Sequence, residues 1–302
     1  MKIAFTTDLP QEGFKRLAGH EMNTSLEEAE ILVSTFDYPV PRKMIESMPN
    51  LRLIANFGAG FNNIDLNACR EREIRVTNTP QPVIEPTAEL AFALMIDIAR
   101  RVSEFDRLVR AGQAQFGVMR NLSHSLYGKT LGIIGMGRIG QALARRAQAA
   151  GMRIIYHNRH RLSDEIEQKY NATYVDFQHV LQDSDYLSLN LPYTQEVHHL
   201  IGIPELGMMK RTAYLINTAR GSHVHEEALV EALKSGIIAG AALDVYEHEP
   251  AISADLLTLP NVVLSPHTGT GTWEGRIAMC ENVCDNILAF IEGQTNKMNI
   301  VL

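Results

Sequence analysis

Short apolar runs alternate along the chain with longer stretches that carry a single apolar face. In the N-terminal part, the runs predict strands at Ile3–Thr6, Ile31–Ser34, Arg52–Phe57 and Ile74–Thr77, and an amphipathic stretch predicts a helix at Pro10–Ala18. Because this alternation is typical of parallel sheets covered by helices, we expect an α/β fold.

A second series of the same kind begins at Thr130. It predicts strands at Thr130–Ile134, Arg153–His157, Tyr186–Asn190, Ala213–Asn217, Gly240–Asp244 and Val262–Ser265, and helices at Arg138–Ala150, Pro204–Met209 and Glu226–Ser235. Two series fit two domains in a chain of 302 residues, at about 150 residues per domain.

Between the two series, one long helix is predicted at Thr87–Arg110, apolar nearly all round over its first part, which indicates burial between domains or subunits. The polar segment Ala111–Lys129 then reads as a crossover between domains. A last amphipathic helix at Glu274–Glu292 is too short to be a domain, so we expect it to return to the N-terminal one. The predicted domains are residues 1–98 plus 275–302, and residues 99–274.

The composition is that of an ordinary globular protein, with 45% hydrophobic and 21% charged residues. The net charge of −7 makes bulk binding to nucleic acid or to an anionic membrane unfavourable, and no apolar run is long enough to span a membrane. Three cysteines do not pair evenly, which indicates a reducing compartment, and we expect the protein in the cytoplasm.

A glycine-rich turn connects the strand and the helix that open the second series. It reads Gly135-Met136-Gly137-Arg138-Ile139-Gly140. Gly135 permits a tight turn, Gly137 lets a pyrophosphate approach the backbone, and Gly140 lets the helix pack on the strand. The helix N-terminus offers N–H groups to the phosphates, so the turn predicts a dinucleotide-binding domain at residues 99–274.

The end of the next strand sets the expected cofactor preference. An acidic residue that binds the ribose 2′-hydroxyl is usual there, but this chain has Asn158, with Arg159 and Arg161 close by. Because arginine binds a 2′-phosphate and a carboxylate would repel it, we expect NADP(H) to be preferred. The alternative is that the arginines form a solvated surface cluster and NAD(H) also serves.

Polar residues follow three strands of the second series. They are Arg220, Glu249 and His267, and ligands of open α/β sheets bind beyond such strand ends. Hydride transfer to a 2-oxo acid needs a cation for the carboxylate, a proton donor that titrates near neutrality, and a carboxylate beside the imidazole. Alone, each residue has a structural reading as an ion-pair or core residue, but together they predict a catalytic site.

These motifs resemble those of the NAD(P)-dependent D-2-hydroxyacid dehydrogenases, a family that includes glyoxylate/hydroxypyruvate reductases. The resemblance runs from about Leu51 to His267 and rests on Ile54–Asp65, Thr87–Ala91, Gly135–Gly140, Asn217–Gly221, Asp244–Tyr246, Glu249-Pro250 and Pro266-His267. It implies two Rossmann-like or flavodoxin-like, doubly wound parallel-sheet domains with a cleft between them, a homodimer, and reversible reduction of a small 2-oxo acid.

The resemblance also assigns residues. It implies that Arg220, Glu249 and His267 are catalytic, and the Glu-Pro pair selects Glu249 over Glu247. Backbone N–H groups near Ala59 and Gly60 would hold the substrate carboxylate, with Arg220 and His267 also touching the substrate. The residues expected near the cofactor, besides the glycine-rich turn and the arginines, are Thr87, Leu191, Pro192, Thr218, Ala219, Asp244 and Gly269.

The chain departs from the family where residues 18–31 leave little room for an extra strand and helix. No metal site is predicted, because Cys280 and Cys284 read as core sulfurs and no partner cysteine or acidic cluster suggests a zinc site at His198-His199. His223 and His225 read as loop residues, and Trp273 could line a pocket or pack in a dimer. The competing reading is a dinucleotide-sensing, corepressor-like protein without turnover.

Overall fold

The computed structural model describes residues 1–302 and divides them into two compact units. The first unit holds Met1–Pro86 and Thr270–Leu302, and the second holds Thr87–Gly269. The chain therefore leaves the first unit at residue 86, earlier than the expected boundary at 98, and returns to it at residue 270. No helix is long and apolar enough to cross a membrane.

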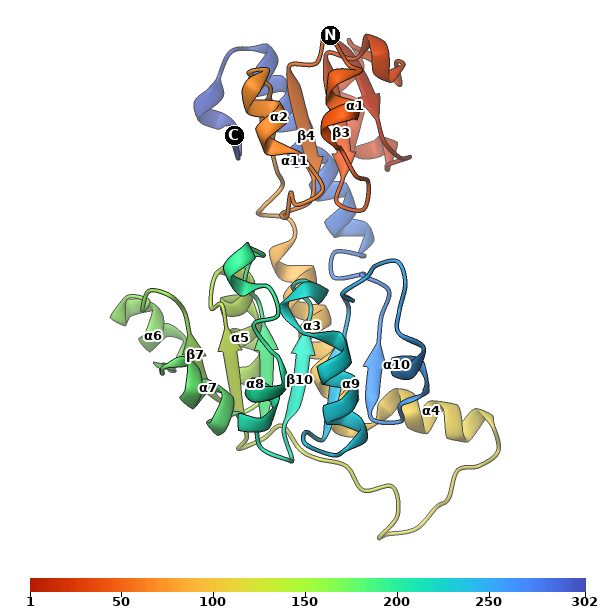
Figure 1. Cartoon of the computed structure of the whole chain (residues 1–302), viewed down its shortest axis with the longest axis vertical. Helices are drawn as coiled ribbons and strands as arrows, with labels where there is room; N and C mark the ends of the chain where they lie inside the picture. Colours follow the sequence, from red (N-terminus) through yellow and green to blue (C-terminus); the bar gives the residue numbers. More distant parts are fainter. The chain divides into compact units, whose positions relative to one another are not determined.

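The sheet of the first unit has five parallel strands in the order β2-β1-β3-β4-β5 (Figure 1). They are β1 (Lys2–Phe5), β2 (Glu21–Met22), β3 (Ile31–Thr35), β4 (Leu53–Phe57) and β5 (Arg75–Thr77). The helices of this unit are η1 (Gln11–Leu17), η2 (Leu26–Glu28), α1 (Arg42–Glu46), α2 (Leu66–Glu71), α11 (Trp273–Ile291) and η5 (Thr295–Lys297). The expected helix at residues 10–18 is a 3₁₀ helix, and residues 18–31 accommodate a strand of two residues and a single turn.

The C-terminal helix α11 packs against β4 and η1, within the same unit as the N-terminal strands. Cys280 and Cys284 lie on its buried face, and a Cβ at Gly13 would fall 2.2 Å from the Cβ of Cys280. Glycine is therefore needed where η1 meets α11. All three cysteines are buried and unpaired, and these two are core sulfurs as predicted.

The sheet of the second unit has seven parallel strands in the order β12-β11-β10-β9-β6-β7-β8. They are β6 (Thr130–Ile134), β7 (Arg153–His157), β8 (Ala172–Tyr174), β9 (Tyr186–Leu189), β10 (Tyr214–Asn217), β11 (Gly240–Leu243) and β12 (Val262–Leu264). The order reverses between β6 and β9, which is the switch point where doubly wound sheets bind ligands. The predicted fold class is confirmed, and the strands that the sequence pattern missed are β8 here and β2 in the first unit.

The helices of the second unit cover this sheet. They are α3 (Ile84–Arg100, which begins in the first unit), α4 (Val102–Arg110), α5 (Arg138–Ala149), α6 (Asp164–Tyr170), α7 (Phe177–Asp183), η3 (Gln195–Val197), α8 (Ile203–Met208), η4 (Gly221–His223), α9 (Glu226–Lys234) and α10 (Ala254–Thr258). One core cluster joins α7, α8 and α9 to β9, β10 and β11. Its burial holds the strands, and hence their ends, in fixed positions.

The prediction of one helix at residues 87–110 is wrong. Arg101 takes a left-handed conformation (φ 56°) and separates α3 from α4. Asp97 accepts the backbone N–H of Ser103 at 2.7 Å, and Arg101 pairs with Glu104 through two hydrogen bonds, so local side chains stabilise the break. Helix α3 is buried along one stripe and not all round, with Ala93 exposed.

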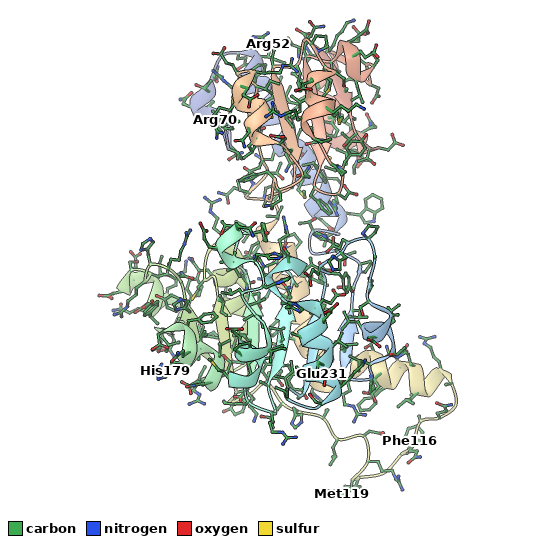
Figure 2. The ribbon with its side chains drawn as sticks, in the orientation of Figure 1. Arg52, Arg70, Phe116, Met119, His179 and Glu231 are labelled. Carbon is green, nitrogen blue, oxygen red and sulfur yellow. The ribbon has the colours of Figure 1, made fainter.

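Residues 111–129 lie within the second unit and do not connect the two units. Figure 1 shows this segment as an extended loop between α4 and β6 that runs away from the sheet. It carries large apolar side chains in solvent, including Phe116 (91% exposed) and Met119 (77% exposed), both labelled in Figure 2. These side chains form an exposed apolar stretch on the surface of the second unit.

Candidate active site

The glycine-rich turn between β6 and α5 has the geometry that each of its glycines suggests. Gly135 has φ +92°, and a Cβ there would lie 2.7 Å from the backbone nitrogen of Leu191. A Cβ at Gly140 would lie 2.7 Å from the Gly135 carbonyl oxygen, whereas a Cβ at Gly137 would meet nothing within 4 Å. Two glycines thus serve close packing, and the third leaves open space over the backbone.

That open space lies at the N-terminus of α5. Gly137 is the N-cap residue and has no side chain to accept a hydrogen bond from the first turn. The N–H groups of Arg138 and Ile139, in the first turn of the helix, therefore lack a side-chain cap, and the helix dipole adds partial positive charge. This end of α5 fits the pyrophosphate of a dinucleotide, as the motif predicts.

The three residues expected near a ribose 2′-phosphate differ in their surroundings. Asn158 Oδ1 accepts the backbone N–H of Met136 at 2.7 Å, which ties the end of β7 to the glycine-rich turn. Arg161 binds the carboxylate of Glu167 through two hydrogen bonds of 2.9 and 2.6 Å. Arg159 is exposed and forms no ion pair, so it is the arginine of this turn that an anion can reach without competing with a carboxylate.

The carboxyl ends of five strands lie side by side at one edge of the sheet. Ile134 of β6 pairs with Leu189 of β9, and Leu189 pairs with Asn217 of β10. Asn217 pairs in turn with Leu243 of β11, and Leu243 with Leu264 of β12. Residues that follow these five positions are therefore held near one another by the register of the sheet.

Glu249 and His267 meet beyond β11 and β12. His267 Nδ1 lies 2.7 Å from Glu249 Oε2, and Glu249 Oε1 accepts the backbone N–H of Tyr246 at 2.8 Å. Burial raises the pKa of Glu249, but the hydrogen bonds from His267 and Tyr246 and the charge of Arg220 outweigh it, so the pKa lies below its usual value. The carboxylate is ionised at neutral pH and faces the imidazole.

The turn that carries His267 is held by the buried carboxylate of Asp244. Its oxygens accept hydrogen bonds from the Ser265 hydroxyl at 2.7 Å and from the backbone N–H groups of Thr268 and Gly269, each at 2.8 Å. His267 itself has a left-handed backbone (φ 53°), which is uncommon outside glycine. Asp244 thus holds both sides of a strained residue whose side chain faces Glu249.

Arg220 lies in the loop after β10, close enough to Glu249 for their charges to attract but without a salt bridge between them. Its Nη1 donates to the carbonyl oxygen of Ala219 at 2.6 Å, and its own carbonyl accepts from Asn217 Nδ2 at 2.9 Å. Burial lowers the pKa of the guanidinium, although the carboxylate of Glu249 raises it. The cation is held in place and has no carboxylate partner of its own.

The other residues expected near the cofactor lie around the same edge of the sheet. Thr87 and Asp244 are buried and both come within 3.5 Å of a Cβ placed on Gly269. Thr218 Oγ1 is buried without a hydrogen-bond partner, which is unusual for a hydroxyl. Leu191 and Pro192 follow β9. Ala219 follows β10, and its carbonyl accepts a hydrogen bond from Arg220. All residues of this set therefore lie close to the strand ends.

In the first unit, the loop Gly58–Gly60 follows the carboxyl end of β4. Asn56 Nδ2 donates to the Gly60 carbonyl and Asn78 Nδ2 to the Ala59 carbonyl, each at 2.8 Å. The backbone N–H groups of Ala59 and Gly60 form no hydrogen bond within the protein. The loop is therefore fixed through its carbonyls and offers two neighbouring donors that suit an anion.

Three residues of this region have contacts that the sequence did not predict. Glu247 pairs with His199 at 2.5 Å, so His198-His199 does have an acidic partner, contributed from 48 residues away. His223 is fully buried beside the backbone of Pro192 and Arg220, and burial lowers its pKa to about 4. His225 caps α9 by accepting the Ala228 N–H, so neither histidine is a simple loop residue.

Comparison with known proteins gives concordant similarities. The family model described as D-isomer specific 2-hydroxyacid dehydrogenase, NAD binding domain, matches residues 92–269, more than half of the chain. The glyoxylate reductase of Thermococcus litoralis is 46% identical over 97% of this chain and 94% of its own length.

Solved structures agree with the sequence comparison. A glyoxylate reductase from Paecilomyes thermophila superposes with a TM-score of 0.89 at 35% identity, covering 100% of this chain and 98% of its own. An NADPH-dependent glyoxylate/hydroxypyruvate reductase from Sinorhizobium meliloti, solved with NADP and malonate, has a TM-score of 0.86 at 31% identity, with 96% and 93% covered.

Proposed function

Because the chain belongs to the D-isomer specific 2-hydroxyacid dehydrogenase family, we propose that it reduces a small 2-oxo acid reversibly to the D-2-hydroxy acid with NADPH or NADH. The observation that carries this proposal is the contact between Glu249 and His267, at the same sheet edge as the glycine-rich turn. An ionised carboxylate facing an imidazole is the arrangement that a proton donor of neutral pH requires.

Each polar group has a separate task in this reaction. When bound, the nicotinamide supplies the hydride. His267 donates a proton from Nε2 to the substrate oxygen, because Nδ1 faces Glu249. Glu249 stabilises the imidazolium before transfer and fixes the plane of the ring. In the reverse direction the imidazole accepts the hydroxyl proton.

Arg220 stabilises the charge that develops on the substrate oxygen and binds the neighbouring carboxylate. A guanidinium offers parallel N–H donors that match two oxygens at once. Since Arg220 is oriented by Ala219 and has no salt bridge, its charge is available to a substrate anion. Its partial burial strengthens that attraction relative to water.

The substrate proposed is glyoxylate or hydroxypyruvate. Relatives that share more than 40% identity over nearly the whole chain are named glyoxylate reductases, which supports this choice. The N–H groups of Ala59 and Gly60 form no hydrogen bond within the protein and are available to an anion. A competing corepressor-like role without turnover has no observation in its favour.

For the cofactor, we propose that NADP(H) is preferred over NAD(H). Asn158 removes the carboxylate that would repel a 2′-phosphate, and Arg159 is exposed without an ion pair. Arg161 contributes less, because Glu167 already binds its guanidinium. Arg159 is therefore the residue on which the preference depends.

A homodimer is also proposed, formed through residues 111–129. The loop exposes Phe116, Val118, Met119, Leu122 and Tyr127, each at least 60% accessible. A second copy that covers these side chains would bury apolar surface, which is unfavourable when exposed to water.

We place the protein in the cytoplasm, since its three cysteines are unpaired, and fractionation of cells would test this.

The direct test is NADPH oxidation by the purified protein with glyoxylate, hydroxypyruvate, pyruvate, 2-ketogluconate and phenylpyruvate. Turnover with at least one of these acids is expected, and the product should be the D-enantiomer where a stereocentre forms. His267→Ala is the control that separates enzymatic turnover from background oxidation. Tight binding of NADPH with no turnover of any 2-oxo acid would contradict the proposal.

A further inference from the structure

Two neighbouring histidines and a distant glutamate meet on the second unit, apart from Arg220 and His267. The ligand atoms of His198, His199 and Glu247 all lie within 4.8 Å of one another. His198 and His199 follow the short helix η3, whereas Glu247 lies in the loop after β11. Neither the hydride-transfer reaction nor cofactor binding uses these three side chains.

The backbone at His199 brings the two imidazoles to the same side. Neighbouring side chains of an extended chain point in opposite directions. His199 is left-handed (φ 52°), and its ring stacks on that of His198 with centroids 3.9 Å apart. The His199 N–H donates to the Ser222 carbonyl at 2.8 Å, which fixes this turn against the segment after Arg220.

Glu247 is oriented before any ion binds. Its Oε2 accepts the backbone N–H of Glu226 at 2.9 Å, and its own N–H donates to Glu226 Oε2 at 3.1 Å. The remaining oxygen, Oε1, faces His199 Nε2 at 2.5 Å. A ligand carboxylate held by a second group in this way is typical of metal sites in proteins.

Two further side chains border the cluster. The His225 ring lies 4.6 Å from that of His199, and because its Nδ1 accepts the Ala228 N–H, its other nitrogen is left for a fourth ligand bond. The Tyr193 hydroxyl lies 3.3 Å from His198 Nδ1, so His198 is oriented to present Nε2. The donor set is thus two or three imidazoles and one carboxylate.

We propose that His198, His199 and Glu247 bind a divalent transition-metal ion, with Zn²⁺ and Co²⁺ as the probes. Imidazole nitrogens with one carboxylate suit these ions, whereas Mg²⁺ and Ca²⁺ prefer oxygen ligands. The ion connects the 198–199 turn to the loop that also carries Glu249, and so stabilises the second unit. It takes no part in hydride transfer.

The test is zinc titration of the full-length protein after treatment with a chelator and dialysis, followed by calorimetry and by thermal unfolding. One ion per chain and a higher Tm are expected, because an ion that binds only the folded state stabilises it. Co²⁺ should give the visible absorption of a low-coordinate site. His198→Ala is the principal variant, since His198 is exposed and its loss leaves the pair of His199 and Glu247 intact.

His198→Ala and Glu247→Gln should each weaken zinc binding at least about tenfold. The matched control is His179→Ala, because His179 (labelled in Figure 2) also contacts a carboxylate, that of Asp176, at 2.8 Å, but has no third ligand. Binding in this control should equal that of the wild type. Absence of zinc binding, or unchanged binding in His198→Ala, would overturn the proposal. The cluster would then be only a pair of His199 and Glu247.

Discussion

The main-chain oxygen of Asp244 accepts a hydrogen bond from the backbone N–H of His267 at 2.8 Å, so the residue after β11 directly holds the turn that follows β12. The Asp244 carboxylate holds the same turn through Ser265, Thr268 and Gly269. The position of the imidazole therefore depends on a buried carboxylate that does not contact it. Asp244 acts as a positioning residue for His267.

Asp244→Asn should lower kcat by about 10- to 100-fold, because one accepting oxygen becomes a donor that faces N–H groups and displaces the imidazole. A larger change in kcat than in KM for the 2-oxo acid is the expected signature in steady-state kinetics. Asp185→Asn is the matched control. Asp185 accepts the Thr130 N–H where β6 begins, at the other end of the sheet, so that variant should lower Tm and preserve kcat.

The contact between Glu249 and His267 predicts unequal losses of activity when each partner is changed. His267→Ala should reduce kcat by about 10²- to 10⁴-fold. Glu249→Gln should lower kcat by only about tenfold, since the amide can still contact Nδ1 but brings no negative charge beside the ring. An unchanged kcat in Glu249→Gln, measured under the same steady-state conditions, would contradict the role of the carboxylate.

Arg159 and Arg161, which follow β7, should differ in their effect on the cofactor preference. Arg159→Ala should lower kcat/KM for NADPH by about 10- to 100-fold, as expected for the loss of one charge-assisted hydrogen bond. The kcat/KM for NADH should change little. Arg161→Ala is the comparison, because the Arg161 guanidinium is bound to Glu167. Its loss should alter the ratio of kcat/KM for NADPH to kcat/KM for NADH much less. Equal effects of the two substitutions, or a wild-type preference for NADH, would rule out the assignment of Arg159.

Buried His223 predicts a loss of stability in acid. Burial lowers its pKa from 6.5 to about 4, so between these values the unfolded chain binds a proton that the folded chain excludes. The free energy of unfolding therefore rises with pH between about 4 and 6.5, and the effect of His223 levels off above 6.5. Across this window His223 accounts for a rise of about 3 kcal/mol. Denaturant unfolding of His223→Phe at several pH values should show a shallower slope, and an unchanged slope would refute the burial argument.

The exposed loop predicts an oligomer that two substitutions can dissociate. Phe116→Ser combined with Met119→Ser should shift the protein from a dimer towards a monomer in size-exclusion chromatography with light scattering. Leu257→Ser is the control, since Leu257 is 63% exposed on α10 of the same unit and lies outside the loop. A wild-type monomer, or a dimer that survives the double substitution, would show that the loop has another use.

The sequence pattern predicts those parts of the fold that depend on local periodicity. Strand positions and the placing of Arg220, Glu249 and His267 at one sheet edge follow from apolar runs and from parallel register. The break at Arg101 does not, because the apolar stripe continues through it and only the hydrogen bond from Ser103 to Asp97 reveals a turn. Local propensity does not register such side-chain contacts.

Contacts between distant segments explain the remaining differences. The pairing of His199 with Glu247 joins residues 48 positions apart, and no spacing rule connects them. The burial of His223 depends on the loop after β9, which approaches it only in the folded unit. The polar composition of residues 111–129 also gave no indication that the apolar side chains of this segment are exposed to solvent.

The edge strand β5 of the first unit is completed by the last residues of the chain. Val76 donates its N–H to the Leu302 carbonyl and accepts that of Val301, while Thr77 bridges to Ile300. During synthesis on the ribosome, the second unit is complete once residue 269 has emerged, whereas the first must wait for its closing segment. Strands β1–β5 are therefore made before the second unit but reach their final packing after it, and until then they are exposed to aggregation.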